Sequence, residues 1–153
     1  MASFRSQLIA SIMRLTMKKK LGKSGDPAKE RAFLDKMSAM SSRRPLGKYD
    51  VVGGVSGEWQ QASLGSADNV ILYLHGGAYV IGSPASHRDM VGAMADAAQA
   101  RAFIVDYRLA PETIFPGAVD DAVAAYKGLL ENHFRTGRSL YSRPDTALLT
   151  TCH

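Results

Sequence analysis

The sequence predicts an α/β protein, in which a mostly parallel sheet is flanked by helices, and three observations indicate this fold class. The runs 70–74 and 101–107 are mainly apolar, as strands buried on both faces are. Each run precedes a segment with apolar residues at helical spacing, over 86–98 and 117–131. Alternation of strand and helix is typical of a sheet that helices cover on both faces.

The first expected element is a basic helix over 3–21. Its apolar residues recur at helical spacing, at Phe4, Leu8, Ile12 and Leu15. Every charged residue before Asp26 is basic. Three interpretations stay open: a cap or packing helix of a larger fold, an organelle presequence, and a helix through which residues 1–23 make weak contact with a membrane surface.

A second helix is expected over 28–40, before the break at 41–45. The two helices together make residues 1–45 a helical, cap-like segment. We expect the methionines of the second helix to fill the core. Its apolar side carries Phe33, Leu34, Met37 and Met40.

Residues 46–132 are expected to form the core of the domain. Short β-like pieces at 50–52 and 58–60, hinged by glycines, precede a turn at 63–69 and the strand at 70–74. In the helix at 86–98, the apolar side is expected to hold Met90, Met94 and Ala97. In the helix at 117–131, it is expected to hold Ala118, Val119, Ala122, Val123 and Tyr126.

Composition and charge exclude several classes of protein. Hydrophobic content of 46% and charged content of 22% are values of globular chains and not of disordered ones. The net charge of +5 is concentrated in a basic N-terminal cluster without interleaved aromatic residues, so we expect no nucleic-acid partner. No apolar run is long enough to span a bilayer, and basic residues interrupt the N-terminus, which disfavours secretion. The single cysteine, Cys152, makes no disulfide framework and favours a reducing, cytoplasmic location.

A glycine turn directly follows the first buried strand, at His75-Gly76-Gly77-Ala78-Tyr79. Glycines lack a β-carbon, so the backbone can take positive φ and present consecutive N–H groups to a negatively charged oxygen. At the carboxyl end of a strand, where α/β folds bind ligands, such a nest can stabilise a tetrahedral oxyanion. The alternative is a tight strand-to-helix turn whose glycines serve sterics alone.

Further motifs follow the glycine turn in order. They are Gly82-Ser83, Asp106-Tyr107-Arg108-Leu109-Ala110-Pro111-Glu112, Phe115-Pro116 and Asp120-Asp121-Ala122. Together with the turn, they resemble the hormone-sensitive-lipase-like branch of the α/β-hydrolase esterases, over residues 70–130. The resemblance implies an α/β-hydrolase fold, here incomplete, with 49–62 as its opening antiparallel strands. It also implies hydrolysis of small acyl esters through an acyl-enzyme intermediate, with no cofactor and no metal ion.

The resemblance assigns roles to the turn residue by residue. The family's His-Gly-Gly-Gly motif falls on His75, Gly76, Gly77 and Ala78, which implies an oxyanion hole at Gly76, Gly77 and Ala78. The N–H donors would be those of Gly77 and Ala78. Ala78 departs from the motif, because its β-carbon narrows the allowed φ although the backbone donor survives. His75 and Tyr79 are implied to support the turn, and His75 is not the catalytic base.

The loop after the second buried strand carries three charged residues of the family motif. The resemblance implies that Asp106, Arg108 and Glu112 form one buried or half-buried charge network, which pins this loop near the site. The family usually has His-Pro before Phe-Pro, where this chain has Thr113-Ile114. This departure bears on the local shape of the loop.

The catalytic residues of the family are missing from these residues. Its nucleophile is a serine in a Gly-x-Ser-x-Gly elbow, followed later by the acid and the base, and no such elbow exists in the sequence. We therefore expect an N-terminal half that keeps the oxyanion hole, lacks the serine, aspartate and histidine of the triad, and does not hydrolyse esters alone. The alternative is a non-catalytic binding protein that uses the basic N-terminal helix at membranes or partners.

The character of the sequence changes after Glu131. Residues 133–153 are expected to fit neither a strand nor the elbow, and the sheet is expected to keep an unpaired apolar edge. One hypothesis is a frameshift near Phe134 that leaves an out-of-frame tail. Codons for residues 138–148, read two bases later, can encode an apolar run and a serine turn. The alternative is a genuine short paralogue with its own tail.

Overall fold

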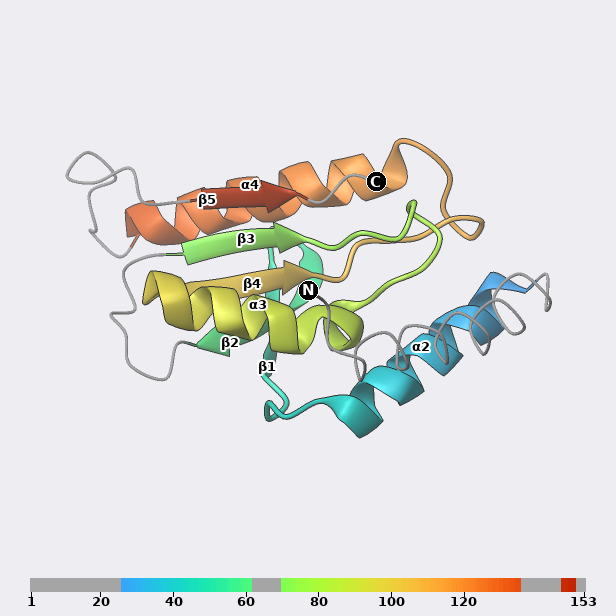
Figure 1. The fold of residues 1–153 in the computed structure, drawn as a ribbon. Coiled ribbons are helices and arrows are strands. Elements are labelled where there is room, and N and C mark those ends of the chain that lie inside the picture. Colours follow the sequence, from blue (N-terminus) through green and yellow to red (C-terminus); the bar gives the residue numbers. More distant parts are fainter. Residues whose placement is uncertain (1–25, 62–69, 136–146, 151–153) are drawn as a thin grey trace, which may run out of the picture.

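A computed structural model describes residues 26–61, 70–135 and 147–150 (Figure 1). The expected helix at 3–21 and the turn at 63–69 lie outside the described residues. Within those residues, no helix is long and apolar enough to cross a membrane. The elements in chain order are α2 (Pro27–Ser41), β1 (Lys48–Val52), β2 (Val55–Gln61), β3 (Val70–Leu74), α3 (Pro84–Ala98), β4 (Arg101–Val105), α4 (Gly117–Arg135) and β5 (Ala147–Thr150).

The strands form one mixed sheet in the order β1-β2-β4-β3-β5. β1 pairs with β2, and β2 with β4, in antiparallel fashion. β3 runs parallel to both β4 and β5. The expected α/β fold class is therefore confirmed, with antiparallel strands first and parallel pairing from β4 onward. In β3 every residue from Val70 to Tyr73 is buried, as its continuous apolar run predicts.

The prediction that the last residues form no strand is wrong. Ala147–Thr150 form β5, whose register places Ala147 opposite Ile71 and Thr150 opposite Leu74. A short segment suffices because the edge of β3 offers unpaired backbone groups, which gain hydrogen bonds from any extended neighbour. The sheet still ends in an edge strand on this side, but that strand is β5 and not β3. α4 also runs beyond its predicted end, to Arg135. The out-of-frame origin of residues 133–153 stays a prediction.

The sheet is covered on both faces, as Figure 1 shows with α3 in front of it and α4 behind. The crossovers β3-α3-β4 and β4-α4-β5 move in opposite directions along the sheet, which sends the two helices to opposite faces. Alternate residues of β3 therefore enter different cores. Ile71 and Tyr73 pack with Val91 of α3, whereas Leu72 packs with Ala125 and Leu129 of α4.

The two covering helices bury sides that differ in part from those predicted. Of the residues expected to face the core, Met94 and Ala118 are partly buried against it. α3 buries Arg88, Val91 and Ala95, while Met90 is exposed. α4 buries Asp121, Ala125, Gly128 and Leu129. Small residues decide this orientation because they let a helix approach the sheet; a β-carbon at Gly128 would meet the backbone of Gly53. The expected inner residues Val119, Val123 and Tyr126 are exposed.

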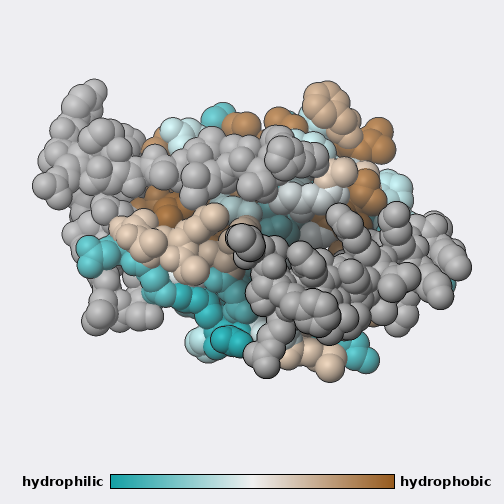
Figure 2. Space-filling view, in the orientation of Figure 1, coloured by the Kyte–Doolittle hydropathy of each residue, from teal (hydrophilic) through white to brown (hydrophobic). Residues whose placement is uncertain are grey.

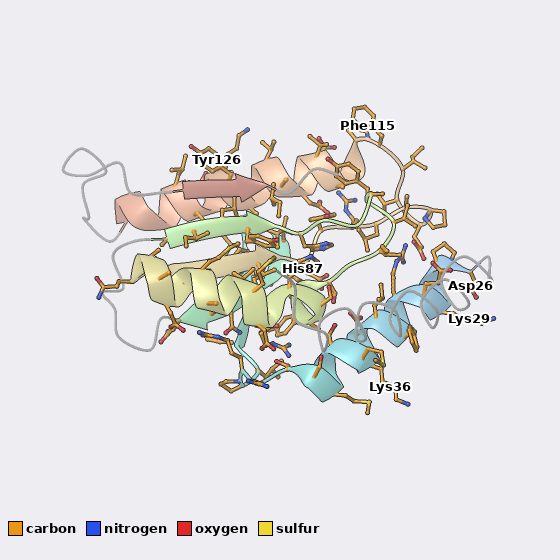
Figure 3. The ribbon with its side chains drawn as sticks, viewed as in Figure 1. Asp26, Lys29, Lys36, His87, Phe115 and Tyr126 are labelled. Carbon is orange, nitrogen blue, oxygen red and sulfur yellow. The ribbon has the colours of Figure 1, made fainter. Side chains whose placement is uncertain are left out.

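An apolar surface results from this orientation of α4. In Figure 2 apolar side chains gather at the upper right, where Figure 1 shows the start of α4 and the loop before it. Phe115, labelled in Figure 3, projects outward there and is 84% exposed. The residues of this surface, which we call the α4 stripe, are Ile114, Phe115, Val119, Val123 and Tyr126.

Helix α2 sits against the molecule without a buried residue of its own. The prediction that its methionines fill the core is wrong, because Met37 and Met40 are exposed. Polar contacts join this segment to α3 instead. Ser83, the N-cap of α3, donates a hydrogen bond to Asp35, and Arg44 pairs with Asp96. α2 is therefore a helix docked by side-chain hydrogen bonds.

Candidate oxyanion site

The turn after β3 contains three consecutive residues with positive φ: Gly77 at 131°, Ala78 at 53° and Tyr79 at 59°. Such values are rare for alanine and tyrosine and cluster at functional sites. The N–H groups of Val80 and Ile81 both donate to the carbonyl of Gly77, at 3.0 Å, and close the turn. Within the described residues, the N–H groups of Gly77 and Ala78 donate to no acceptor. Both donors are thus available to an external anion.

Gly77 is the position where the turn depends on glycine. Its φ of 131° is one that residues with a side chain rarely adopt. A β-carbon there would also meet the carbonyl oxygen and side chain of Ile81. Ala78, the departure from the family motif, takes a left-handed conformation at φ 53°, which is strained for a residue with a β-carbon but sterically allowed. The alanine is therefore compatible with the turn.

His75 lies buried beneath the turn, with 3% of its surface exposed. Its ring stacks on Tyr107, with centroids 4.3 Å apart and planes inclined by 13°. Nδ1 lies 3.0 Å from the carbonyl oxygen of Gly76 and 3.2 Å from the Tyr107 hydroxyl, which also donates to the carbonyl of His75. Burial lowers the pKa of His75 to about 4, against a smaller opposing effect of the Gly76 hydrogen bond. The imidazole is consequently neutral near pH 7 and packs as part of the turn's support.

The prediction that Asp106, Arg108 and Glu112 form one charge network is wrong, because they make separate contacts. Arg108 pairs with Asp121 at 2.7 Å, and its backbone N–H donates to the same carboxylate at 2.9 Å. Glu112 pairs instead with Arg31 of α2. Asp106 joins neither pair, and its pKa is raised by loss of hydration and then by repulsion from Asp35. Each ion pair ties the loop to a different helix.

The two ion pairs hold the carboxylates in their charged forms. A hydrogen bond from Arg108 is the largest cause of the lowered pKa of Asp121, and one from Arg31 does the same for Glu112. Asp121 is buried, whereas the side chain of Glu112 is 57% exposed. The pair on α4 is thus the better shielded from solvent, although the Arg108 side chain is itself 58% exposed.

Tyr79, at the end of the turn, contacts the charged loop through its backbone. Its carbonyl accepts a hydrogen bond from Ala110 at 2.8 Å. Its ring is half exposed and lies 6.1 Å from the ring of Tyr107. A backbone hydrogen bond therefore joins the turn to the loop, and both segments carry motifs of the same family.

Two residues near the turn carry contacts that the sequence interpretation did not foresee. Tyr107 supports His75 by stacking and hydrogen bonding. Arg31 reaches the carbonyl of Val80, the residue after the turn's left-handed run. A role for Tyr107 was predictable in principle, because Tyr107 lies within the motif at 106–112. Arg31 gave no signal, since it stands far away in the sequence on a helix without a recognisable motif.

The part of the chain that the structure describes holds no group of three or more histidine, cysteine, aspartate or glutamate side chains suited to a metal ion.

Comparison with known proteins identifies similar chains. The family described as alpha/beta hydrolase fold matches residues 71–145. An acetyl-hydrolase of Streptomyces hygroscopicus is 46% identical over 94 residues, which are 61% of this chain and 31% of the relative. A mutant of the esterase E40 has a similar structure, with a TM-score of 0.80 and 35% identity, over 97% of this chain and 48% of its own. An esterase from the bacterial hormone-sensitive lipase family gives a TM-score of 0.68 and 39% identity, over 82% and 40%. The chain spans less than half the length of each of these proteins.

Proposed function

Because the chain belongs to the hormone-sensitive-lipase-like family of α/β hydrolases, we propose that it carries the oxyanion-binding half of a carboxylic-ester hydrolase. The observation that carries this proposal is the turn at Gly77 and Ala78, with two backbone donors that meet no acceptor among the described residues. Attack on an ester carbonyl puts negative charge on its oxygen. Two fixed N–H groups stabilise that charge more than they stabilise the neutral ester.

The location of the turn in the sheet supports the same function. The crossover out of β3 leads to β4 on one side, and the crossover out of β4 returns past β3 to β5 on the other. The carboxyl end of β3 therefore stands where the strand order reverses, which is where open α/β sheets bind ligands. We propose a small acyl ester as the substrate of the complete site, with short acyl groups, because the similar Streptomyces protein is an acetyl-hydrolase.

The sequence of these residues also bears on catalysis. They contain no Gly-x-Ser-x-Gly elbow, so no serine nucleophile of the family type is present to form the oxyanion that the turn would stabilise. We propose that this chain alone does not turn over esters by an acyl-enzyme mechanism. Its purified form should hydrolyse p-nitrophenyl acetate no faster than the variant Gly77→Ala. Turnover that is lost in the variant would overturn the claim of a missing nucleophile.

A chimera tests whether the turn is a working oxyanion hole. Residues 1–150 of this chain would replace the matching half of esterase E40. The remaining half of E40 would supply the triad residues that this chain lacks. The chimera should hydrolyse p-nitrophenyl butyrate, and Gly77→Ala should lower kcat about 100-fold with little change in KM. Gly54→Ala is the matched control, since Gly54 also has positive φ, at 82°, but a β-carbon there meets nothing. A folded, active chimera that tolerates Gly77→Ala would contradict the proposal.

A further inference from the structure

Arg31 of α2 contacts both segments around the candidate site. Nε donates to the carbonyl of Val80 at 2.6 Å, and Nη2 donates to the carbonyl of Ala110. Nη1 and Nη2 each donate to one oxygen of Glu112, at 2.9 Å. Its side chain is only 19% exposed although α2 buries no residue completely. The guanidinium therefore joins three polar partners in two segments remote in the sequence.

The chemistry of these contacts requires an arginine. A guanidinium offers its donors in a planar fork, which can meet a carboxylate with two parallel hydrogen bonds and still donate to neighbouring carbonyls. An ammonium group is a compact point charge and cannot reproduce this pattern. The ion pair with Glu112 fixes the plane of the fork, and the fork then fixes the directions of the Val80 and Ala110 carbonyls.

These contacts close a ring around the strained end of the turn. Val80 directly follows the three residues with positive φ. Tyr79 accepts a hydrogen bond from the N–H of Ala110, and Arg31 binds the carbonyl of the same Ala110 and that of Val80. A left-handed alanine and tyrosine are strained and persist only where surrounding contacts hold them. The ring supplies such contacts at the point where the chain leaves the turn.

We propose that Arg31 is a positioning residue, which holds the backbone at Ala78 and Tyr79 in the conformation that presents the oxyanion donors. The significance of that conformation rests on the proposed function, whereas the conformation itself can be measured without any activity. Arg31 thereby makes the geometry of the turn depend on a helix that contributes nothing to the sheet.

The alternative role for Arg31 is to dock α2, and other residues separate the two roles. Asp35 accepts a hydrogen bond from Ser83, Ser42 donates to Asp89 at 2.7 Å, and Arg44 pairs with Asp96. These contacts join the α2 segment to α3 without touching the turn. Removal of Arg31 should therefore leave α2 in place and disturb the turn. Removal of Arg44 should change the contact with α3 and leave the turn unchanged, because the Asp35 and Ser42 contacts still hold α2.

The test uses backbone amide spectra and hydrogen exchange of the whole chain. Arg31→Met should move the amide resonances of residues 77–81. It should also speed exchange of the Val80, Ile81 and Ala110 N–H groups by about tenfold or more, as expected when a charge-assisted hydrogen bond is lost. Arg31→Lys should restore part of the protection, because an ammonium can still reach one carbonyl.

Two matched controls accompany these variants. Lys36→Met removes a positive charge from an exposed position of α2, where Figure 3 shows the side chain projecting away from the sheet. Arg44→Met removes a guanidinium that contacts α3. Neither should change exchange at Val80, Ile81 or Ala110, although Arg44→Met should change amides of α2 and α3.

The outcomes separate this inference from the proposed function. Unchanged resonances at 77–81 in a folded Arg31→Met protein overturn the inference, as does the same disturbance of the turn in Arg44→Met. Unfolding of both Arg31 variants, seen by circular dichroism, overturns it too, because the role would then be global. An inactive chimera with a normal Arg31 effect on the amides would count against the proposed function alone.

Discussion

At the scale of single residues, the buried imidazole of His75 links the turn to pH. Its pKa is about 4 in the folded chain, against an ordinary value of 6.5, and burial is the main cause. Between these values the unfolded chain binds more protons than the folded chain. Above pH 6.5, His75 therefore leaves the free energy of unfolding unchanged. As the pH falls from 6.5 towards 4, the free energy of unfolding decreases.

This difference predicts a measurable slope of stability with pH. The free energy of unfolding should fall by about 3 kcal/mol through His75 as the pH falls across that window. His75→Phe keeps an aromatic ring to stack on Tyr107 but cannot take up a proton, so its stability should vary less over the same range. Urea titrations of both proteins at a series of pH values measure the two slopes. Parallel slopes would show that His75 is not the titrating group.

Glu58 and Arg88 form the most deeply buried ion pair of the described residues. Glu58 is 0% exposed, and Arg88 donates to its two oxygens at 2.6 and 2.9 Å. Burial pushes the pKa of Glu58 upward, but the hydrogen bonds from Arg88 and from the Gly47 N–H, with the charge of Arg88, lower it overall. The carboxylate thus stays charged inside the protein because each oxygen has a partner.

Removal of one partner should be costly for this reason. Glu58→Gln should lower the free energy of unfolding by about 3–5 kcal/mol, because it leaves the Arg88 guanidinium buried without its counter-charge. Glu131→Gln, at an exposed position of α4, should stay within about 0.5 kcal/mol of the parent. Replacement of both partners, as Glu58→Leu with Arg88→Met, should recover part of the loss. A small effect of Glu58→Gln in urea unfolding would argue against a desolvated pair.

The residues of the site differ in how far the sequence could predict them. The conformation of Gly77 was predictable from the sequence, because consecutive glycines after a buried strand are the ordinary means to reach positive φ. The ion-pair partners of Arg108 and Glu112 did not follow from the motif, since a charged residue in a loop does not specify which helix carries its partner. Arg31 could not be inferred at all, because its role depends on how α2 docks.

At the scale of elements, strand positions followed from the sequence better than helix orientations. The continuous apolar runs of β3 and β4 have no competing interpretation. A helix rich in alanine has several apolar sides, and its largest residues suggested the wrong one in α4. Close packing selected the side with Ala125 and Gly128, because small residues let the helix approach the sheet.

The α4 stripe should bind apolar probes. Exposed apolar residues in a contiguous set favour association, so the chain should enhance the fluorescence of the dye ANS. The double variant Val119→Lys with Val123→Glu should lower that fluorescence with little loss of stability, because both residues are exposed and the new ones favour helix. Ala125→Lys, on the buried side, should unfold the protein. Equal dye binding by the double variant and the parent would locate the apolar surface elsewhere.

The start of α3 depends on one side chain. Ser83 caps the helix and accepts a hydrogen bond from the Ser86 N–H at 3.2 Å, while the Ser86 hydroxyl returns one to Ser83. Ser83→Ala should therefore lower the free energy of unfolding by about 1 kcal/mol, whereas Ser83→Thr, which keeps the hydroxyl, should cost less. Thermal unfolding of both variants measures the difference. Equal losses would show that the cap contributes little.

At the scale of the whole molecule, α2 is held differently from the other helices. Its polar contacts with α3 are partly exposed to solvent, and none of its residues is buried. Such contacts are weakened by salt, whereas apolar packing is not. Amides of α2 should therefore exchange faster at high ionic strength, while those of β3 and β4 should keep their protection. Uniform exchange across α2 and the sheet, with no effect of salt, would indicate that α2 unfolds only with the rest.

The overall architecture was predictable where local pattern and tertiary structure agree. Alternating apolar strands and helices fixed the α/β class, and the opening antiparallel strands came with the motif resemblance. β5 was missed because four residues carry too little periodicity, and their conformation depends on the open edge of β3. A strand that forms because it pairs with a neighbouring strand cannot be predicted from its own residues alone.

The division of the core by the sheet has a consequence for sequence change over time. The clusters on the two faces share no residue, although β3 and β4 contribute alternate side chains to both. A substitution at Leu72 should be compensated at positions such as Phe103 or Leu129, and one at Tyr73 at positions such as Val91 or Ile104. Related sequences should therefore show coordinated replacements within each set and independent drift between the sets, so the two halves of the core can diversify at separate rates.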